Sequence, residues 1–123
     1  MEAMLDGVDV PLYGVLDGYD PLKLRIGEYK SGRLWTQDMV NESGQLKMYS
    51  LLVWLDSRQL PSEIMLHWAK THYIEGKGIE LTGEMQSFEA KISLEVMLTF
   101  SARVRTVWDG IKKLSELHFQ GIR

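Results

Sequence analysis

The chain has 123 residues, 45% of them hydrophobic and 25% charged, which is enough for one globular domain with a core and too little for two. Cysteine is absent, which excludes disulfide scaffolds and thiolate metal sites, and no apolar run approaches the ~20 residues that span a bilayer. The net charge of −3 counts weakly against nucleic-acid binding, and the acidic N-terminal residues do not fit a signal peptide, so we expect a cytoplasmic protein.

The first quarter of the chain is expected to form strands. Residues 2–18 hold two short apolar runs around a turn-like pair, which predicts a β-hairpin whose second strand runs from about Pro11 to Asp17. Gly18-Tyr19-Asp20-Pro21 predicts a turn. Residues 22–30 alternate as a strand does, and the alternation shifts at Gly27, where a bulge or a simple irregularity is expected.

The rest of the chain alternates helical and extended patterns. Thr36 is a good N-cap for a helix over about residues 37–56, and residues 62–73 and 79–91 predict an antiparallel hairpin. From Ser93 onward, apolar residues at helical spacing describe a long helix. The sequence therefore predicts one α/β or α+β domain, with an antiparallel or mixed sheet of four or five strands, one inserted helix and one terminal helix.

One short stretch combines acids with a lysine. Glu28 and Lys30 lie two apart on the expected strand and so share a face, whereas Tyr29 is expected to point the other way, into packing. Asp17 lies one hairpin earlier. Carboxylate oxygens suit Mg²⁺ or Mn²⁺, and a neighbouring lysine can steady the hydroxide that a metal generates. The alternative for each residue alone is a solvated strand face or a turn-initiating aspartate.

Three segments resemble, in order and spacing, the core of the PD-(D/E)XK nuclease superfamily, with the RecB-type and phage exonucleases as the nearest branch. The resemblance covers residues 11 to about 55. It implies a restriction-endonuclease-like core and a metal-dependent deoxyribonuclease, an exonuclease acting in DNA recombination, repair or phage DNA processing. The segments are Gly14-Val15-Leu16-Asp17, Glu28-Tyr29-Lys30-Ser31-Gly32 and Gln45-Leu46-Lys47-Met48-Tyr49.

The resemblance also implies a role for each matching residue. Asp17 and Glu28, with the carbonyl of Tyr29, would bind one or two Mg²⁺ or Mn²⁺ ions. Lys30 would orient or activate the attacking water. The side chains that would position the DNA are those of Gln45 and Tyr49.

Further residues beside these motifs have two interpretations each. Arg33 and Trp35 can grip phosphate or stack on a base, or they are an exposed loop arginine and a packed indole. Complete members of the superfamily have an N-terminal helical region that contributes another acid or a histidine. This chain starts almost directly on the first strand, where Glu2 can stand in for that acid.

The missing helical region leaves rival functions open. The chain can be an inactive or incomplete nuclease-fold module that binds DNA or a protein partner, or it can need a second subunit to complete the site. An endonuclease or junction resolvase on the same core is a further alternative, because one fold hosts several activities.

Overall fold

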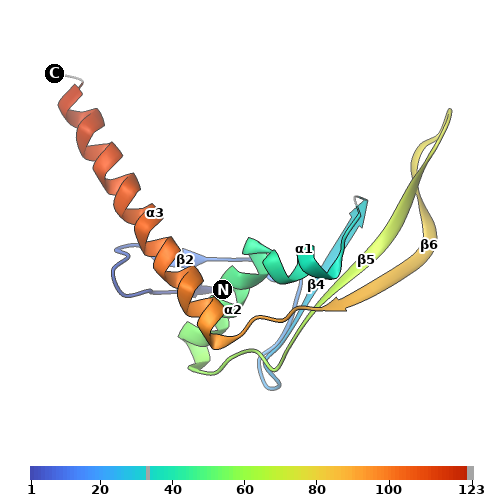
Figure 1. Ribbon diagram of the computed structural model, residues 1–123, viewed down its shortest axis with the longest axis horizontal. Coiled ribbons are helices and arrows are strands. Elements are labelled where there is room, and N and C mark those ends of the chain that lie inside the picture. The colour runs from blue at the N-terminus through green and yellow to red at the C-terminus, as the bar shows by residue number, and fades with distance from the viewer. Residues whose placement is uncertain (33, 122–123) are drawn as a thin grey trace.

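Figure 1 shows the computed structural model of the chain, which describes residues 1–32 and 34–121. Two strands form a small sheet and four form the main sheet. Two helices connect strands of the main sheet, and a third follows its last strand. In chain order, the elements are β1 (Glu2–Ala3), β2 (Leu12–Tyr13), β3 (Gly18–Asp20), β4 (Arg25–Gly32), α1 (Gln37–Glu42), α2 (Gly44–Ser57), β5 (Glu63–Ile74), β6 (Gly78–Glu89) and α3 (Leu94–Gly121).

The main sheet is mixed and has the order β3-β4-β5-β6. β3 pairs antiparallel with β4, β4 pairs parallel with β5, and β5 pairs antiparallel with β6. A parallel pair needs a long crossover connection, which α1 and α2 supply between β4 and β5. The structure is therefore α+β, as predicted, with a four-stranded mixed sheet and the expected β5–β6 hairpin.

The strands near the N-terminus differ from the prediction. The expected strand from Pro11 to Asp17 is reduced to Leu12–Tyr13, and the expected turn at residues 18–21 begins with strand β3. The turn lies further on because the Asp20 carboxylate accepts hydrogen bonds from the N–H groups of Leu22 and Lys23, at 3.0 and 3.2 Å. The bulge or irregularity expected at Gly27 is also wrong, because β4 pairs with both neighbours without a change of register.

The single helix expected over residues 37–56 is two helices. The Thr36 hydroxyl accepts a hydrogen bond from the Met39 N–H and caps α1, as predicted. Ser43 then ends α1, and its hydroxyl accepts a hydrogen bond from the Leu46 N–H, so it also caps α2. A serine that satisfies the free N–H groups of a new helix allows the chain to change direction without losing backbone hydrogen bonds.

One face of the main sheet is covered and the other is open. Side chains of α1 and α2 pack against β4, β5 and β6 in a continuous core, which includes Val40, Leu46 and Leu66, each 0% exposed. On the opposite face Tyr29 and Met85 are 59% and 64% exposed. Glu28 and Lys30, the candidate site residues of β4, lie on the covered face, because their side chains alternate with that of Tyr29.

Two elements extend beyond this core in diverging directions, so the molecule is V-shaped (Figure 1). One arm is the far end of the β5–β6 hairpin, and the other is the C-terminal part of α3. α3 packs on α2 and on the N-terminal segment through Met97, which is 0% exposed, and further along through Val104 and Trp108; the helix then continues past these contacts. None of the helices in the described part of the chain is long and apolar enough to cross a membrane.

Candidate metal centre

Strand β4 places Glu28 in apolar surroundings. Its in-register neighbour on β5 is Leu66, which pairs in turn with Phe88 on β6. Glu28 is only 3% exposed although it carries a carboxyl group. Burial raises the pKa of this carboxyl above its ordinary value, because desolvation disfavours the charged form.

The two oxygens of the Glu28 carboxyl have different environments. The Lys30 ammonium lies 3.2 Å from Oε1, as the shared strand face predicts. Its charge and hydrogen bond lower the pKa of Glu28, although not enough to offset burial. Oε2 is buried and has no hydrogen-bond donor. A buried oxygen without a hydrogen-bond donor lowers the stability of the fold by about 1–3 kcal/mol, and a bound proton or cation would remove that cost.

Asp17 lies beside Glu28 at the edge of the sheet. The pairing of β3 with β4 ends where Gly18 lies opposite Gly27. Beyond that point the Tyr29 N–H of β4 donates a hydrogen bond to the Asp17 carboxylate over 3.0 Å. The Asp17 carboxyl is close enough to Glu28 to raise the pKa of Glu28 further, because a second carboxyl group nearby disfavours the charged form. The two acids and the lysine are therefore brought together.

Helix α2 holds the loop that carries Asp17. The Tyr49 hydroxyl donates to the carbonyl of Val15 over 2.8 Å and accepts from the Gln45 amide at the same distance. Gly14 lies so close to α2 that a Cβ there would be 2.8 Å from Leu52 Cδ1 and 3.2 Å from the Tyr49 ring. Only a residue without a side chain allows this approach, so Gly14 and Tyr49 together fix the path of the loop.

Tyr49 and Gln45 thus have a structural role in addition to the DNA contacts predicted for them. The Tyr49 ring is 5% exposed and packs in the main core, and its hydroxyl both donates and accepts within the chain. Burial raises the pKa of the Tyr49 hydroxyl, and the nearby Glu28 carboxylate adds to that rise. The helix therefore contributes a positioning pair beside the two acids.

The remaining predicted residues have different outcomes. The expected inward packing of Tyr29 is wrong: its ring is 59% exposed on the open face of the sheet and stacks on His67 with 5.2 Å between ring centroids. The Trp35 indole is half-buried and packs against the main core, as its structural interpretation predicted. Arg33 lies outside the described residues.

The donor set contains two acids rather than three. Among the residues that the structure describes, no group of three or more histidine or acidic side chains could hold a metal ion, so Glu2 does not join Asp17 and Glu28. Two carboxylates with one unpartnered oxygen still fit Mg²⁺, which is usually bound by one or two carboxylates and retains several waters. Asp17 and Glu28 are therefore the residues that could hold such an ion, with the Tyr29 carbonyl as an additional oxygen.

No pattern in the sequence indicates the neighbour of Tyr29. His67 lies directly opposite Tyr29 in the parallel β4–β5 register, and its Nδ1 is 2.7 Å from the Ser87 hydroxyl on β6. Tyr29, His67 and Ser87 form a row across three strands. The row cannot be predicted until the pairing of the strands is known, because these residues are far apart in the chain. It lies on the opposite face of the sheet from Glu28.

Comparison of the chain with protein-family models, with curated proteins and with solved structures finds no match. The function is therefore inferred from the side chains of the site.

Proposed function

We propose that the protein is a metal-dependent nuclease that hydrolyses phosphodiester bonds in DNA, with Asp17 and Glu28 as metal ligands. One observation carries the proposal: two carboxyl groups converge beside the Lys30 ammonium, and Oε2 of Glu28 is buried without a donor. A structural ion pair alone does not need the second acid, whose presence makes the site less favourable until a cation binds.

The chain's own residues have separable roles in this proposal. A bound Mg²⁺ or Mn²⁺ would supply Lewis-acid polarisation of the phosphate and lower the pKa of a bound water. The Lys30 ammonium, held by Glu28 and partly exposed, would orient the attacking water or neutralise charge that develops on the phosphate. Gln45 and Tyr49 hold the Asp17 loop in place, and the Tyr29 carbonyl is proposed as a third oxygen ligand.

Contacts to the DNA are part of the same proposal. Gln45, Tyr49, Arg33 and Trp35 are the residues that the resemblance to PD-(D/E)XK nucleases suggests for phosphate or base contacts. Because Tyr49 is buried and its hydroxyl is engaged, its share in DNA binding would be indirect, through the loop it supports. The biological setting proposed is DNA recombination, repair or phage DNA processing in the cytoplasm of the cell or of the phage's host.

The test is hydrolysis of linear DNA by the purified chain with Mn²⁺ or Mg²⁺, compared with the same reaction in a chelator. Lys30→Ala should lower the rate by about 100-fold or more, as removal of a charged group at a developing negative charge does. Lys70→Ala is the matched control, because Lys70 is a partly exposed lysine of the same sheet that pairs with Glu84 at 3.5 Å. Equal rates for wild type and Lys30→Ala would overturn the role of Lys30. Circular DNA separates an endonuclease from the proposed exonuclease.

A second function is favoured by the small donor set. Since only two acids gather among the described residues, the chain can instead be a nuclease-fold module that binds DNA or a protein partner without cutting. Calorimetric titration with Mn²⁺ separates the two. Binding that disappears in Glu28→Gln supports the metal centre, whereas no binding, together with retained binding of DNA, supports the inactive module.

A further inference from the structure

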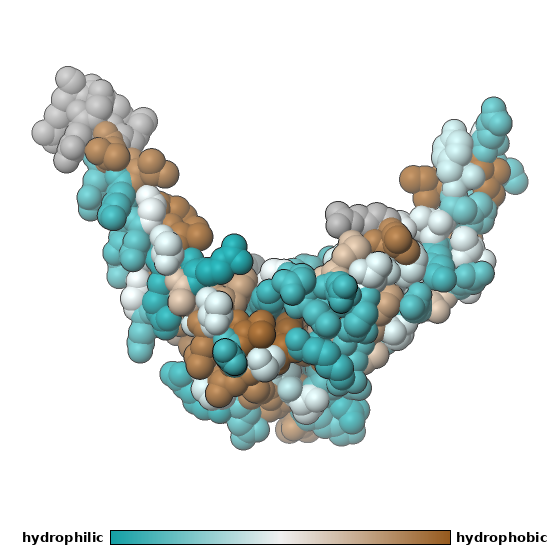
Figure 2. Space-filling view, in the orientation of Figure 1, coloured by the Kyte–Doolittle hydropathy of each residue, from teal (hydrophilic) through white to brown (hydrophobic). Residues whose placement is uncertain are grey.

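The arm formed by α3 exposes an apolar stripe. Val107, Ile111, Leu114 and Leu117 follow one another at steps of four and three residues, so they lie along one side of the helix. They are 62%, 47%, 68% and 63% exposed. Figure 2 shows hydrophobic side chains along this arm, outside the core. We call these four residues the distal stripe.

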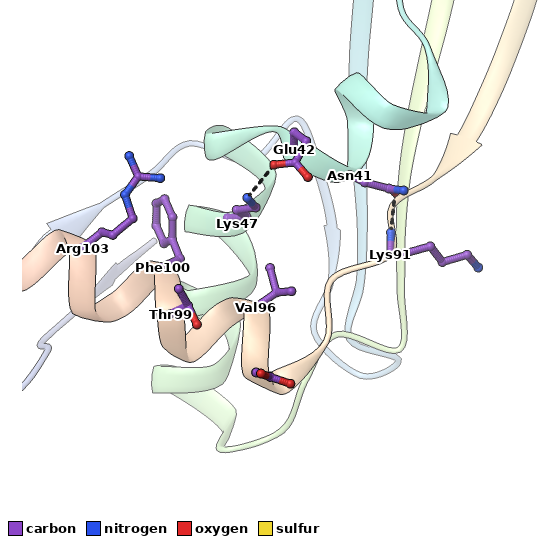
Figure 3. A pocket seen from close by; sticks show the side chains of 9 residues that line it. Asn41, Glu42, Lys47, Lys91, Val96, Thr99, Phe100 and Arg103 are labelled. Atoms are coloured by element: carbon purple, nitrogen blue, oxygen red, sulfur yellow. Dashed lines mark hydrogen bonds and ion pairs between the residues drawn. The ribbon is translucent and has the colours of Figure 1, made fainter.

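Toward the core the same side of α3 borders a groove. Two neighbouring hollows of about 490 and 480 Å³ lie between α3 and the α1–α2 junction, and both are lined by Glu42, Phe100 and Arg103. Figure 3 shows the first of them, with Phe100 and Arg103 from α3 facing the Glu42–Lys47 pair. The second continues along α3 to Val107, the first residue of the distal stripe.

The groove and the distal stripe match in length and chemistry. Along α3 the groove runs from Glu95 to Val107, about 18 Å of helix at 1.5 Å per residue. The distal stripe, from Val107 to Leu117, is about 15 Å long. The hollow nearer the start of α3 presents the apolar side chains of Val96 and Phe100 among polar and charged residues, and the second hollow adds Met48 and Val107.

We propose that a second copy of this chain is the occupant: the distal stripe of each copy lies in the groove of the other, with the two α3 helices antiparallel. Such an interface is isologous, because the same two surfaces meet twice about one two-fold axis. It buries both distal stripes at once and closes, so the assembly is a dimer rather than a filament.

Charge complementarity sets the direction of the helices. In the antiparallel arrangement Lys113 lies opposite Glu95 of the second copy when the axis passes near Val104, which is midway between residues 95 and 113. Glu95 also lines the groove. A parallel, in-register pair would instead oppose each charge to its own copy, which is destabilising.

The first experiment measures the mass of the full chain in solution across a dilution series. We expect twice 14.2 kDa at high concentration. Ile111→Asp and Leu114→Asp should each raise the dimer dissociation constant about 10- to 100-fold, since each removes a large apolar side chain from the interface. Both side chains are exposed in the single chain, so far-UV circular dichroism should not change. Glu116→Lys is the matched control, because Glu116 is exposed and lies about two and a half helical turns from Val107, on the opposite side of α3.

The second experiment tests the direction. The chain has no cysteine, so single substitutions give unambiguous cross-links. An equal mixture of Glu95→Cys and Lys113→Cys should cross-link between the two variants, and neither variant should cross-link with itself. Self-cross-linking of each variant would show a parallel pair and overturn the proposal. A chain that stays monomeric at every concentration, or an equal loss of dimer in Glu116→Lys, would overturn it as well and leave the distal stripe to another protein or a lipid surface.

Discussion

The candidate metal centre and the projecting half of α3 are unusual in opposite ways, because the first buries a charged side chain and the second exposes apolar side chains. Glu28 is a charged residue that is 3% exposed, whereas Leu114 is an apolar residue that is 68% exposed. Charged groups are seldom buried without a partner, and an apolar stripe is seldom left in water unless it binds something. The partner proposed for each region therefore suits its chemistry, a divalent cation for the buried carboxylates and an apolar helix for the exposed stripe.

The two regions also differ in how they are built. Asp17, Glu28 and Lys30 are held by hydrogen bonds and a close glycine contact, so small changes of backbone should be felt at once. The side chains of the distal stripe are 47–68% exposed, so changes there should have little effect on the single chain. On the other side of α3, Trp108 packs against the core and Lys112 lies 3.4 Å from Asp9.

The largest effect is expected from the two acids. Asp17→Asn and Glu28→Gln should each lower Mn²⁺ affinity by about 100-fold and abolish DNA hydrolysis, because a neutral amide is a much poorer ligand for a hard cation. Titration calorimetry and a DNA digestion assay measure the two quantities. Glu63→Gln is the control, since Glu63 is a partly exposed acid of the same sheet that pairs with Arg25 at 3.6 Å. If Glu28→Gln bound Mn²⁺ like wild type, the proposed metal centre would be wrong.

The next effect is expected from the glycine that fits against α2. Gly14→Ala places a methyl group 2.8 Å from Leu52 Cδ1, which should cost about 1–3 kcal/mol of unfolding free energy and displace the Asp17 loop. Mn²⁺ affinity should fall with it. Gly44→Ala has open space around the new methyl group and lies in α2, so it should leave the unfolding free energy unchanged or raise it by up to about 1 kcal/mol. Urea unfolding of both variants checks this, and equal costs would show that the close approach does not hold the loop.

The grouping of the three site residues was accessible from the sequence because it depends on local rules. Side chains two apart on a strand share a face, so Glu28 and Lys30 had to meet, and the chain reverses between Asp17 and β4. Where the prediction failed at Tyr29, the reason is not local. The face of β4 that becomes covered depends on where α1 and α2 cross the sheet, which the alternation of residues 22–30 does not state.

Longer-range features were less accessible. The apolar spacing from Ser93 onward predicted the long helix. It did not predict that α3 extends beyond the core, because that depends on how far the other elements reach. The parallel pairing of β4 with β5, and with it the Tyr29–His67 stack, needs the crossover to be known. Ser43 was hidden in an otherwise helical pattern, although its hydroxyl is what starts α2.

A smaller effect follows from the burial of Glu28. In chelator, Glu28→Gln should raise the unfolding free energy near neutral pH by about 1–2 kcal/mol, because it removes an ionised carboxyl that has an oxygen without a donor. The pKa of Glu28 is raised in the folded chain, so ionising it costs stability above that pKa and costs nothing below the ordinary value of 4.5. The gain should therefore shrink as the pH falls toward 4.5.

Denaturant unfolding across this pH range checks the sign of the effect. Glu80→Gln, an exposed substitution on β6, should show no such trend. A gain in Glu28→Gln that grew on acidification would contradict the assignment of the raised pKa to this carboxyl.

The smallest effect is expected on the arm. In dilute solution, Leu114→Ser should change the unfolding free energy by less than about 0.5 kcal/mol, because the side chain is already in water. Leu46→Ala, in the core and 0% exposed, should cost about 2–5 kcal/mol in the same assay. At high protein concentration wild type should gain stability by mass action whereas Leu114→Ser should not. A cost for Leu114→Ser that was independent of concentration would mean that the arm packs within its own chain.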